Sequence, residues 1–226
     1  MIYGSLCGII NGNVINIHNF IKAFNPNKIY LDVDGVIWHS CQAVCDILNS
    51  VYCTNVKGSD ILSWNFKEFD KEFIDEDIEE LFGNRRFFEI VKWVKGAFEF
   101  IRIYKDKIII VTKGTKDNIY YKLTVFESLG LDVPIISLPF TCSKGSIDMI
   151  GGLHIDDCTN NLIESNATHK IQFLEYKDNI TVVNMDLNDL SSTYIRKNVL
   201  DKNVSKYLDI ELYQYILDNQ LYINEV

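Results

Sequence analysis

The stretch Lys28-Ile-Tyr-Leu-Asp-Val-Asp-Gly-Val36 decides how the rest of the chain is interpreted. Its apolar, β-prone first half ends in two carboxylates, Asp32 and Asp34, with Gly35 directly behind them. On a strand, residues i and i+2 point the same way, and open α/β sheets bind ligands at the carboxyl ends of their strands. Neighbouring carboxylates repel each other unless a cation neutralises them or one keeps its proton. The stretch therefore predicts a strand that ends at a divalent metal site beside a proton-transferring acid, with a solvated turn as the alternative.

Five further segments are predicted to be strands. Apolar runs that end in polar residues lie at 107–112, 133–138 and 152–157, and two more strands are expected at 169–175 and 180–184. Short apolar runs of this kind are typical of parallel strands that are covered on both faces. Because helix-like segments separate the later runs, the sequence predicts an α/β fold with a doubly wound parallel sheet.

Two of the helix-like segments are expected to cover this sheet. Residues 94–104 form one candidate helix, and residues 117–129 form another that ends at Gly130. The second segment carries apolar residues at helical spacing; they are Ile119, Leu123, Phe126 and Leu129.

Residues 40–92 interrupt the alternation of strands and helices. They contain a helix-like segment at 41–52 and an acidic run at 75–80 that suits a helix N-terminus. An insert of this size directly after the acidic strand is expected to lie over the end of that strand, as a lid would. We interpret its aromatic residues as a small core rather than a platform for stacking a base; they are Trp64, Phe66, Phe69 and Phe73.

Composition narrows the classes of function. The net charge of −9 argues against nonspecific nucleic-acid binding, which needs clustered basic charge. No apolar run approaches the roughly 20 residues that span a bilayer, and residues 1–10 lack the features of a signal peptide. We therefore expect a cytoplasmic protein with no nucleic-acid or membrane partner, whose cysteines are reduced. Cys41, Cys45 and His39 fall short of a zinc ligand set.

A second polar group follows the run 107–112. Thr112 ends this run, with Lys113 and Gly114 behind it. A hydroxyl and free backbone N–H groups at a strand-to-helix turn suit a phosphate group. Thr112 could also be an ordinary β-prone residue. It indicates a phosphate site only together with the polar residues at the other predicted strand ends.

The third polar group precedes the run 152–157, and the fourth ends it. Lys144 lies in the loop before it and offers the compact cation that a phosphoryl group needs. Asp156 and Asp157 end the run and place a second carboxylate pair at the same edge of the sheet. Each residue alone has an ordinary structural explanation, but the ordered set at successive strand ends is hard to obtain by chance.

This ordered set resembles the motifs of the haloacid dehalogenase (HAD) superfamily of phosphatases, over about residues 28–185. The resemblance implies a HAD-like sheet with a small, mainly helical cap inserted after the first strand. It implies that Asp32 is a nucleophile that forms an aspartyl-phosphate, that Asp34 is the acid and then the base, and that Thr112 and Lys144 hold the phosphoryl oxygens. Such covalent catalysis splits one displacement into two easier steps.

The resemblance also implies a Mg²⁺ cofactor. Its ligands would be Asp32, the backbone carbonyl of Asp34 and the pair Asp156-Asp157, with Asp156 favoured as the direct ligand and an exchange of the two left open. A metal ion and a lysine would offset the repulsion between an anionic nucleophile and an anionic phosphate.

Within the superfamily, the chain looks most similar to the 5′(3′)-deoxyribonucleotidases. The insert after the first motif, the runs Phe87-Phe88 and Gly96-Ala97, and Ile155-Asp-Asp followed by Asn161 support this. Ser143 before Lys144 and Cys158 after the acidic pair depart from the usual pattern, which has Asp and often Arg there. The implied substrate is a small phosphorylated compound, a nucleoside monophosphate in particular.

The two ends of the chain resemble a different family, the nicotinamide or nicotinate mononucleotide adenylyltransferases. Residues 186–223 contain a match to its Ile-Ser-Ser-Thr-x-x-Arg hallmark, and residues 4–13 can be aligned with its N-terminal signature, with Ile10 and Asn13 in place of two histidines. The resemblance implies that nucleotide phosphates bind at Ser191, Ser192, Thr193 and Arg196.

These resemblances predict a chimaeric domain organisation. Residues 28–39 and 93–187 would form the HAD-like core and residues 40–92 the cap, with the adenylyltransferase-like segments at 1–27 and 188–226. The leading hypothesis for function is a Mg²⁺-dependent phosphomonoesterase of the 5′-nucleotidase kind. A nucleotidyltransferase, or a nucleotide-binding remnant of one, is the first alternative, and a non-catalytic binding module is the second. The sequence does not give the oligomeric state.

Overall fold

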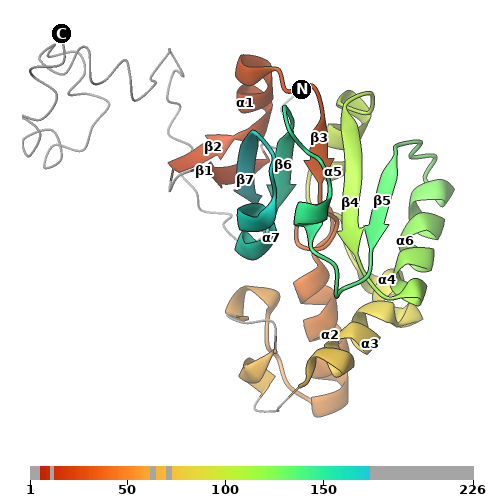
Figure 1. Ribbon diagram of the computed structural model, residues 1–226. Coiled ribbons are helices and arrows are strands. Elements are labelled where there is room, and N and C mark those ends of the chain that lie inside the picture. Colours follow the sequence, from red (N-terminus) through yellow and green to blue (C-terminus); the bar gives the residue numbers. More distant parts are fainter. Residues whose placement is uncertain (1–5, 11–12, 62–64, 70–72, 174–226) are drawn as a thin grey trace, which may run out of the picture. The chain divides into compact units, whose positions relative to one another are not determined.

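A seven-stranded sheet organises the residues that the structure, a computed structural model, describes: 6–10, 13–61, 65–69 and 73–173. The strand order is β2-β1-β7-β6-β3-β4-β5 (Figure 1). The five strands from β7 to β5 pair in parallel, whereas β1 is antiparallel to both β7 and β2. The strands are β1 (Cys7–Ile10), β2 (Asn13–Asn16), β3 (Ile29–Leu31), β4 (Ile108–Lys113), β5 (Ile135–Leu138), β6 (Leu153–Asp156) and β7 (His169–Phe173).

The predicted α/β fold with its mostly parallel sheet is confirmed. Five of the six predicted strands correspond to β3, β4, β5, β6 and β7, and the sixth, at 180–184, lies outside the described residues. Along β3, β4 and β5, alternate side chains enter different apolar clusters, with Leu31 in the larger one and Tyr30 in the smaller one. The parallel strands are thus covered on both faces, as their apolar runs indicated.

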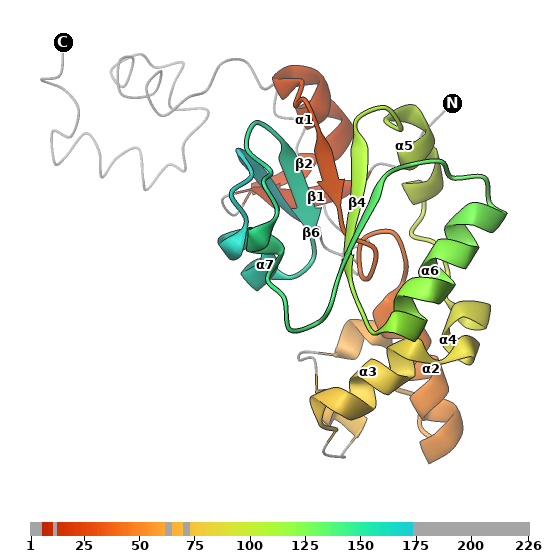
Figure 2. The same ribbon diagram turned by 45° about the vertical axis from the view of Figure 1, so that its right-hand side comes forward.

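Helices lie on the sheet and beyond its carboxyl edge (Figure 2). Ile17 and Phe20 of α1 and Phe100 of α5 join the larger apolar cluster. Between β3 and α5, the chain forms α2, η1, η2, α3 and α4, which Figure 1 draws beyond the arrowheads of β3 and β4. The helices are α1 (Ile17–Phe24), α2 (Ser40–Tyr52), α3 (Asp75–Gly83), α4 (Arg85–Ile90), α5 (Ala97–Ile103), α6 (Lys116–Ser128) and α7 (Thr159–Glu164), with short 3-10 turns η1 (Gly58–Asp60), η2 (Lys67–Phe69) and η3 (Lys144–Ser146).

The segment between β3 and α5 carries the predicted acidic helix start. Three acidic residues occupy the first turn of α3, where the helix dipole favours negative charge. Phe66 and Phe69 are buried in the larger apolar cluster, which agrees with a role in packing, and Trp64 lies outside the described residues. The predicted domain boundaries stay a prediction.

The predicted helix at 117–129 is confirmed as α6, but the spacing of its apolar residues does not mark its buried face. Its buried residues are Asn118, Lys122 and Phe126, whereas Leu123 and Leu129 are 43% and 44% exposed. The apolar spacing misses this face because two of its three inward positions are polar. Both polar residues make hydrogen bonds, so burial does not require them to be apolar.

The N-terminal strands add an antiparallel hairpin to the edge of the parallel sheet. The hairpin pairs Gly8 with Ile15, and β1 in turn pairs Gly8 with Phe173 of β7. The adenylyltransferase resemblance of the N-terminal segment is not tested by this arrangement, and that of the C-terminal segment lies outside the described residues. All six cysteines are in the thiol form. Across the described ranges, we find no helix with the length and apolar character needed to cross a membrane.

We predict that Gly8→Ala destabilises the fold by about 1–3 kcal/mol, the usual cost of overpacking. A Cβ at Gly8 would lie 2.2 Å from Ile171 Cγ2 and 3.0 Å from the Gln172 carbonyl oxygen, so β1 would have to move away from β7. Denaturant unfolding measures the change in the free energy of unfolding. An unchanged value would show that β1 does not pack against β7 as described.

Candidate active site at the carboxyl edge of the sheet

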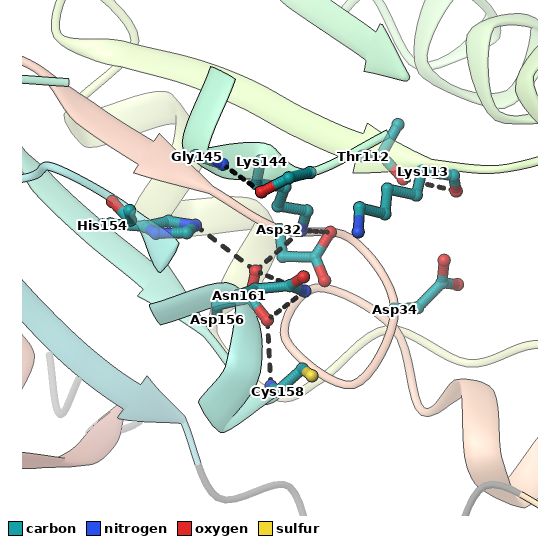
Figure 3. Close-up of polar contacts among 12 residues, drawn as sticks. Asp32, Asp34, Thr112, Lys113, Lys144, Gly145, His154, Asp156, Cys158 and Asn161 are labelled. Carbon is teal, nitrogen blue, oxygen red and sulfur yellow. Dashed lines mark hydrogen bonds and ion pairs between the residues drawn. The ribbon is translucent and has the colours of Figure 1, made fainter. Parts of the chain in front are cut away.

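Two buried carboxylates meet where β3 and β6 end. These strands are parallel neighbours, and the Asp32 N–H donates to the Ile155 carbonyl, so Asp32 and Asp156 reach the same edge of the sheet. Lys144, in η3, places its Nζ 2.8 Å from Asp32 Oδ1 and 2.7 Å from Asp156 Oδ2 (Figure 3). The Lys144 side chain is only 1% exposed. One buried ammonium group therefore links both acids.

Electrostatics makes these two acids unequal. Burial raises the pKa of Asp32 to about 6; Lys144 opposes this shift, and the negative charges of Asp156 and Asp34 add to it. Burial alone would also raise the pKa of Asp156, but the contacts from His154 and Lys144 outweigh it and lower this pKa to about 2. Asp156 is thus a permanent anion, whereas Asp32 exchanges its proton near neutral pH.

Asp156 is almost surrounded by protein donors. Its Oδ1 accepts from the Cys158 backbone N–H at 2.9 Å and from Asn161 Nδ2 at 3.1 Å. Its Oδ2 accepts from Lys144, and Asn161 Nδ2 lies 3.2 Å from it. A carboxylate offers about four lone-pair sites, so Asp156 has little accepting capacity left. The neighbouring Asp157 is exposed.

Three carboxylates converge closely enough to share one ion. One oxygen from each of Asp32, Asp156 and Asp157 lies within 4.8 Å of the others. Gly35 makes room for this convergence: its φ is +71°, and a Cβ there would lie 2.3 Å from Asp157 Oδ2. A set of hard oxygen donors is what Mg²⁺ and Ca²⁺ prefer. The residues present therefore fit the expected Mg²⁺.

Asp34 is held apart from this group by donors from two helices. Ser40 Oγ, at the start of α2, donates to Asp34 Oδ1 at 2.8 Å. Lys122 Nζ, from α6, donates to Asp34 Oδ2 at 2.5 Å and to Thr112 Oγ1 at 2.7 Å. In Figure 3, the Asp34 side chain points away from Asp156. Each carboxylate oxygen of Asp34 therefore has its own donor.

Lys122 is the site residue that we did not predict from the sequence. Its side chain is 1% exposed, and it contacts two predicted motif residues, Asp34 and Thr112. It stands ten positions after Thr112 on a helix whose apolar spacing does not mark its inward face. The only signal in the sequence was that Lys122 lies four residues from both Asn118 and Phe126, which places all three on one face of the helix. This spacing does not identify a site residue until that face is known to point inward.

The predicted phosphate-binding turn lies at the end of β4, as expected, but not all of its backbone N–H groups are free. Thr112 is buried near the end of β4 and accepts from Lys122. The Lys113 carbonyl also accepts from Lys122, at 3.3 Å. The Gly114 N–H donates to the Leu138 carbonyl at 3.0 Å, so it is not free for a phosphate, contrary to the prediction. The predicted terminal phosphate-binding residues lie outside the described part of the chain; they are Ser191, Ser192, Thr193 and Arg196.

The fold and the ordered acids, hydroxyl and lysines define a phosphatase of the HAD type. The family model described as "5′ nucleotidase, deoxy (Pyrimidine), cytosolic type C protein" matches residues 26–189, more than two-thirds of the 226-residue chain. The chain belongs to this family. The resemblance to HAD phosphatases of the deoxyribonucleotidase kind is thereby confirmed, and the protein is a hydrolase of phosphate monoesters. The family match gives no support to the nucleotidyltransferase alternative.

Similarity to solved structures is weak. A Clostridium difficile chain described as a phosphatase is 15% identical, with 62% of this chain and 80% of that chain covered and a TM-score of 0.42. A HAD-superfamily hydrolase from Geobacter sulfurreducens is 12% identical, with 62% and 81% covered and a TM-score of 0.41. The HAD-hydrolase YfnB from Bacillus subtilis, described as bound to magnesium, is 15% identical, with 60% of this chain and 79% of that chain covered and a TM-score of 0.39. No curated protein matches the chain. Similarity at this level says nothing about what the chain binds.

We predict that Mg²⁺ binding releases more protons at pH 6 than at pH 8. With the pKa of Asp32 near 6, about half of these carboxyl groups carry a proton at pH 6 in the metal-free protein, and the ion must displace it. Above the pKa the proton is already lost. Calorimetry of Mg²⁺ binding in buffers of different ionisation enthalpy measures this release. Equal release at the two pH values would contradict the raised pKa of Asp32.

Proposed function

We propose that the protein is a Mg²⁺-dependent phosphatase that hydrolyses a nucleoside monophosphate through an aspartyl-phosphate. The observation that carries the proposal is the buried Lys144 ammonium group, which binds both Asp32 and Asp156 beside the Asp157 carboxylate. The name of the family refers to deoxy and pyrimidine compounds and to a cytosolic type, which supports a nucleotide substrate and a cytoplasmic location. In this proposal, residues 28–39 and 93–187 are the catalytic core and residues 40–92 its cap.

The first step is a displacement at phosphorus. An oxygen of ionised Asp32 forms a bond to phosphorus, the bond from phosphorus to the nucleoside oxygen breaks, and Asp34 gives its proton to that leaving oxygen. In the second step, a water oxygen attacks phosphorus, Asp34 takes the proton of the water, and the bond to Asp32 breaks. Free phosphate, the Asp32 carboxylate and protonated Asp34 result.

The ammonium groups of Lys144 and Lys122 and the hydroxyl group of Thr112 assist both steps. Lys144 lies against Asp32 and would hold a phosphoryl oxygen, as would the Thr112 hydroxyl, with Lys113 nearby in the same turn. Charge placed in advance where the phosphoryl group reacts lowers the barrier because it needs no reorganisation. Lys122 contacts both Asp34 and Thr112 and so acts as a positioning residue for the acid.

The Mg²⁺ would be held by Asp32, the backbone carbonyl of Asp34 and the Asp156-Asp157 pair. When bound, the ion neutralises negative charge on the nucleophile and the phosphate. Because protein donors nearly fill the accepting capacity of Asp156, we assign the direct contact to Asp157 and the anchoring of Lys144 to Asp156. This reverses the order that the sequence favoured.

We predict that Asp32→Asn abolishes hydrolysis, since an amide cannot attack phosphorus. Turnover of a panel of nucleoside monophosphates with Mg²⁺ should fall by at least about 1,000-fold, while circular dichroism and the melting temperature report an intact fold. Asp106→Asn, a change to an exposed acid just before β4, at the opposite end of that strand from Thr112, is the matched control and should keep full activity. A fully active Asp32→Asn variant would refute the proposal.

We predict that Lys122→Met reduces kcat by about 10–100-fold, the usual cost of losing a residue that orients an active-site group. Methionine keeps the length and shape of the side chain but leaves Asp34 and Thr112 without their shared donor. Stability should also fall, because removing one partner of a buried ion pair leaves the carboxylate of Asp34 uncompensated. Steady-state kinetics and thermal unfolding separate the two effects. Unchanged kcat would remove Lys122 from the mechanism.

A further inference from the structure

One buried polar residue near the site has no part in the mechanism so far. Asn118 lies in α6, one helical turn before Lys122, and is 1% exposed. Its Nδ2 donates to the Phe82 carbonyl of α3 at 2.8 Å, and this hydrogen bond is buried. The same inward face of α6 thus contacts the α2–α4 segment through Asn118 and the acid Asp34 through Lys122.

The contact at Asn118 fixes the end of a helix. Phe82 lies in the last turn of α3, where the final carbonyl groups have no partner within the helix. Asn118 supplies a donor to one of them. The next residue, Gly83, also approaches the start of α6, since a Cβ there would lie 3.3 Å from Thr115 Oγ1. The carboxyl end of α3 is therefore joined to the amino end of α6.

The choice of asparagine at this position has a cost. Within the described residues, Asn118 Oδ1 is buried without a hydrogen-bond partner, which is unfavourable. Space for the side chain depends on Gly114, where a Cβ would lie 2.2 Å from Oδ1. An apolar side chain of the same shape would avoid the unpaired oxygen. What it would lack is the N–H group that holds α3.

The contact between α3 and α6 affects Asp34 because one donor to Asp34 belongs to the α2–α4 segment and the other belongs to α6. Ser40 belongs to α2, which packs against α4, whereas Lys122 belongs to α6. Both α3 and α4 pack against α6. The position of the α2–α4 segment on α6 therefore decides whether Ser40 and Lys122 can reach the two oxygens of Asp34 at the same time.

We propose that Asn118 is a positioning residue for Asp34. By holding α3 on α6, its amide keeps Ser40 and Lys122 together on the acid. Asn118 itself makes no described hydrogen bond to the acid, and it meets the predicted phosphate turn only by packing on Gly114. The kinetic consequence rests on the proposed role of Asp34 as proton donor. The structural consequence, coupling between the α3–α6 junction and the first turn of α2, does not.

The kinetic test uses Asn118→Leu, which preserves shape and removes the donor. Proton donation matters for a nucleoside leaving group, a poor one, and much less for p-nitrophenol, which leaves as a stable anion. We expect kcat to fall about tenfold on a nucleoside monophosphate and less than about threefold on p-nitrophenyl phosphate. Val125→Ala, at a half-buried position of the same helix, is the control for loss of packing and should leave the ratio of the two activities unchanged.

A double-mutant cycle with Ser40→Ala tests whether both residues act through Asp34. If they do, the double variant loses little more activity on the nucleotide than the worse single variant, because either change already misplaces the acid. Independent, multiplicative losses would overturn the proposal, as would an unchanged ratio of activities in Asn118→Leu.

Hydrogen exchange tests the same inference without catalysis. In Asn118→Leu, amide exchange should accelerate in the last turn of α3 and also in the first turn of α2, which contains Ser40, but not in β6 or β7. Acceleration confined to α3, or spread over the whole protein, would overturn the proposal; if the leucine variant does not fold, Asn118→Ala is measured instead. A wild-type protein that hydrolyses no phosphate ester would refute the proposed function, while hydrogen exchange would still decide this inference.

Discussion

The ion pairs of one buried lysine are the constraint on which the site depends. Lys144 lies between Asp32 and Asp156 with almost no exposure, and each charge would be costly to bury without the others. The lysine is brought there by a loop, whereas the acids are brought there by two adjacent parallel strands. Asp156 stays ionised and anchors the lysine, which leaves Asp32 as the acid whose charge depends on pH and on a cation. The difference between the two carboxylates thus comes from the number of donors around each one.

A second polar network shares the edge of the sheet with the first but is built on helices. Asp34 receives one donor from α2 and one from α6, so its orientation depends on how the α2–α4 segment sits on the α6 helix. The proposed nucleophile, Asp32, is therefore positioned by the sheet, and the proposed acid, Asp34, by helix packing. Packing between helices, rather than a strand ladder, thus sets the geometry of Asp34.

The parts of the fold that depend on local sequence pattern could be predicted from the sequence. The parts that depend on contacts between residues distant in sequence could not. The apolar runs gave the parallel strands, and Asp32, Thr112 and Asp156 lie at the predicted strand ends because each belongs to its own run. Lys122 and the inward face of α6 were missed because their partners are distant in sequence and make polar residues suitable for burial. The proposed order of Asp156 and Asp157 at a metal ion also depends on a donor from α7, Asn161, which no local pattern reveals.

Trapping the covalent intermediate tests the central claim most directly. Rapid acid quenching during turnover of a ³²P-labelled nucleoside monophosphate, followed by peptide mapping, locates any phosphoryl group on the protein. The account predicts an acid-stable, hydroxylamine-sensitive acyl phosphate on the peptide that contains Asp32, and none in an enzyme without Mg²⁺. A label on another residue, or hydrolysis with no label on the protein at any quench time, would contradict it.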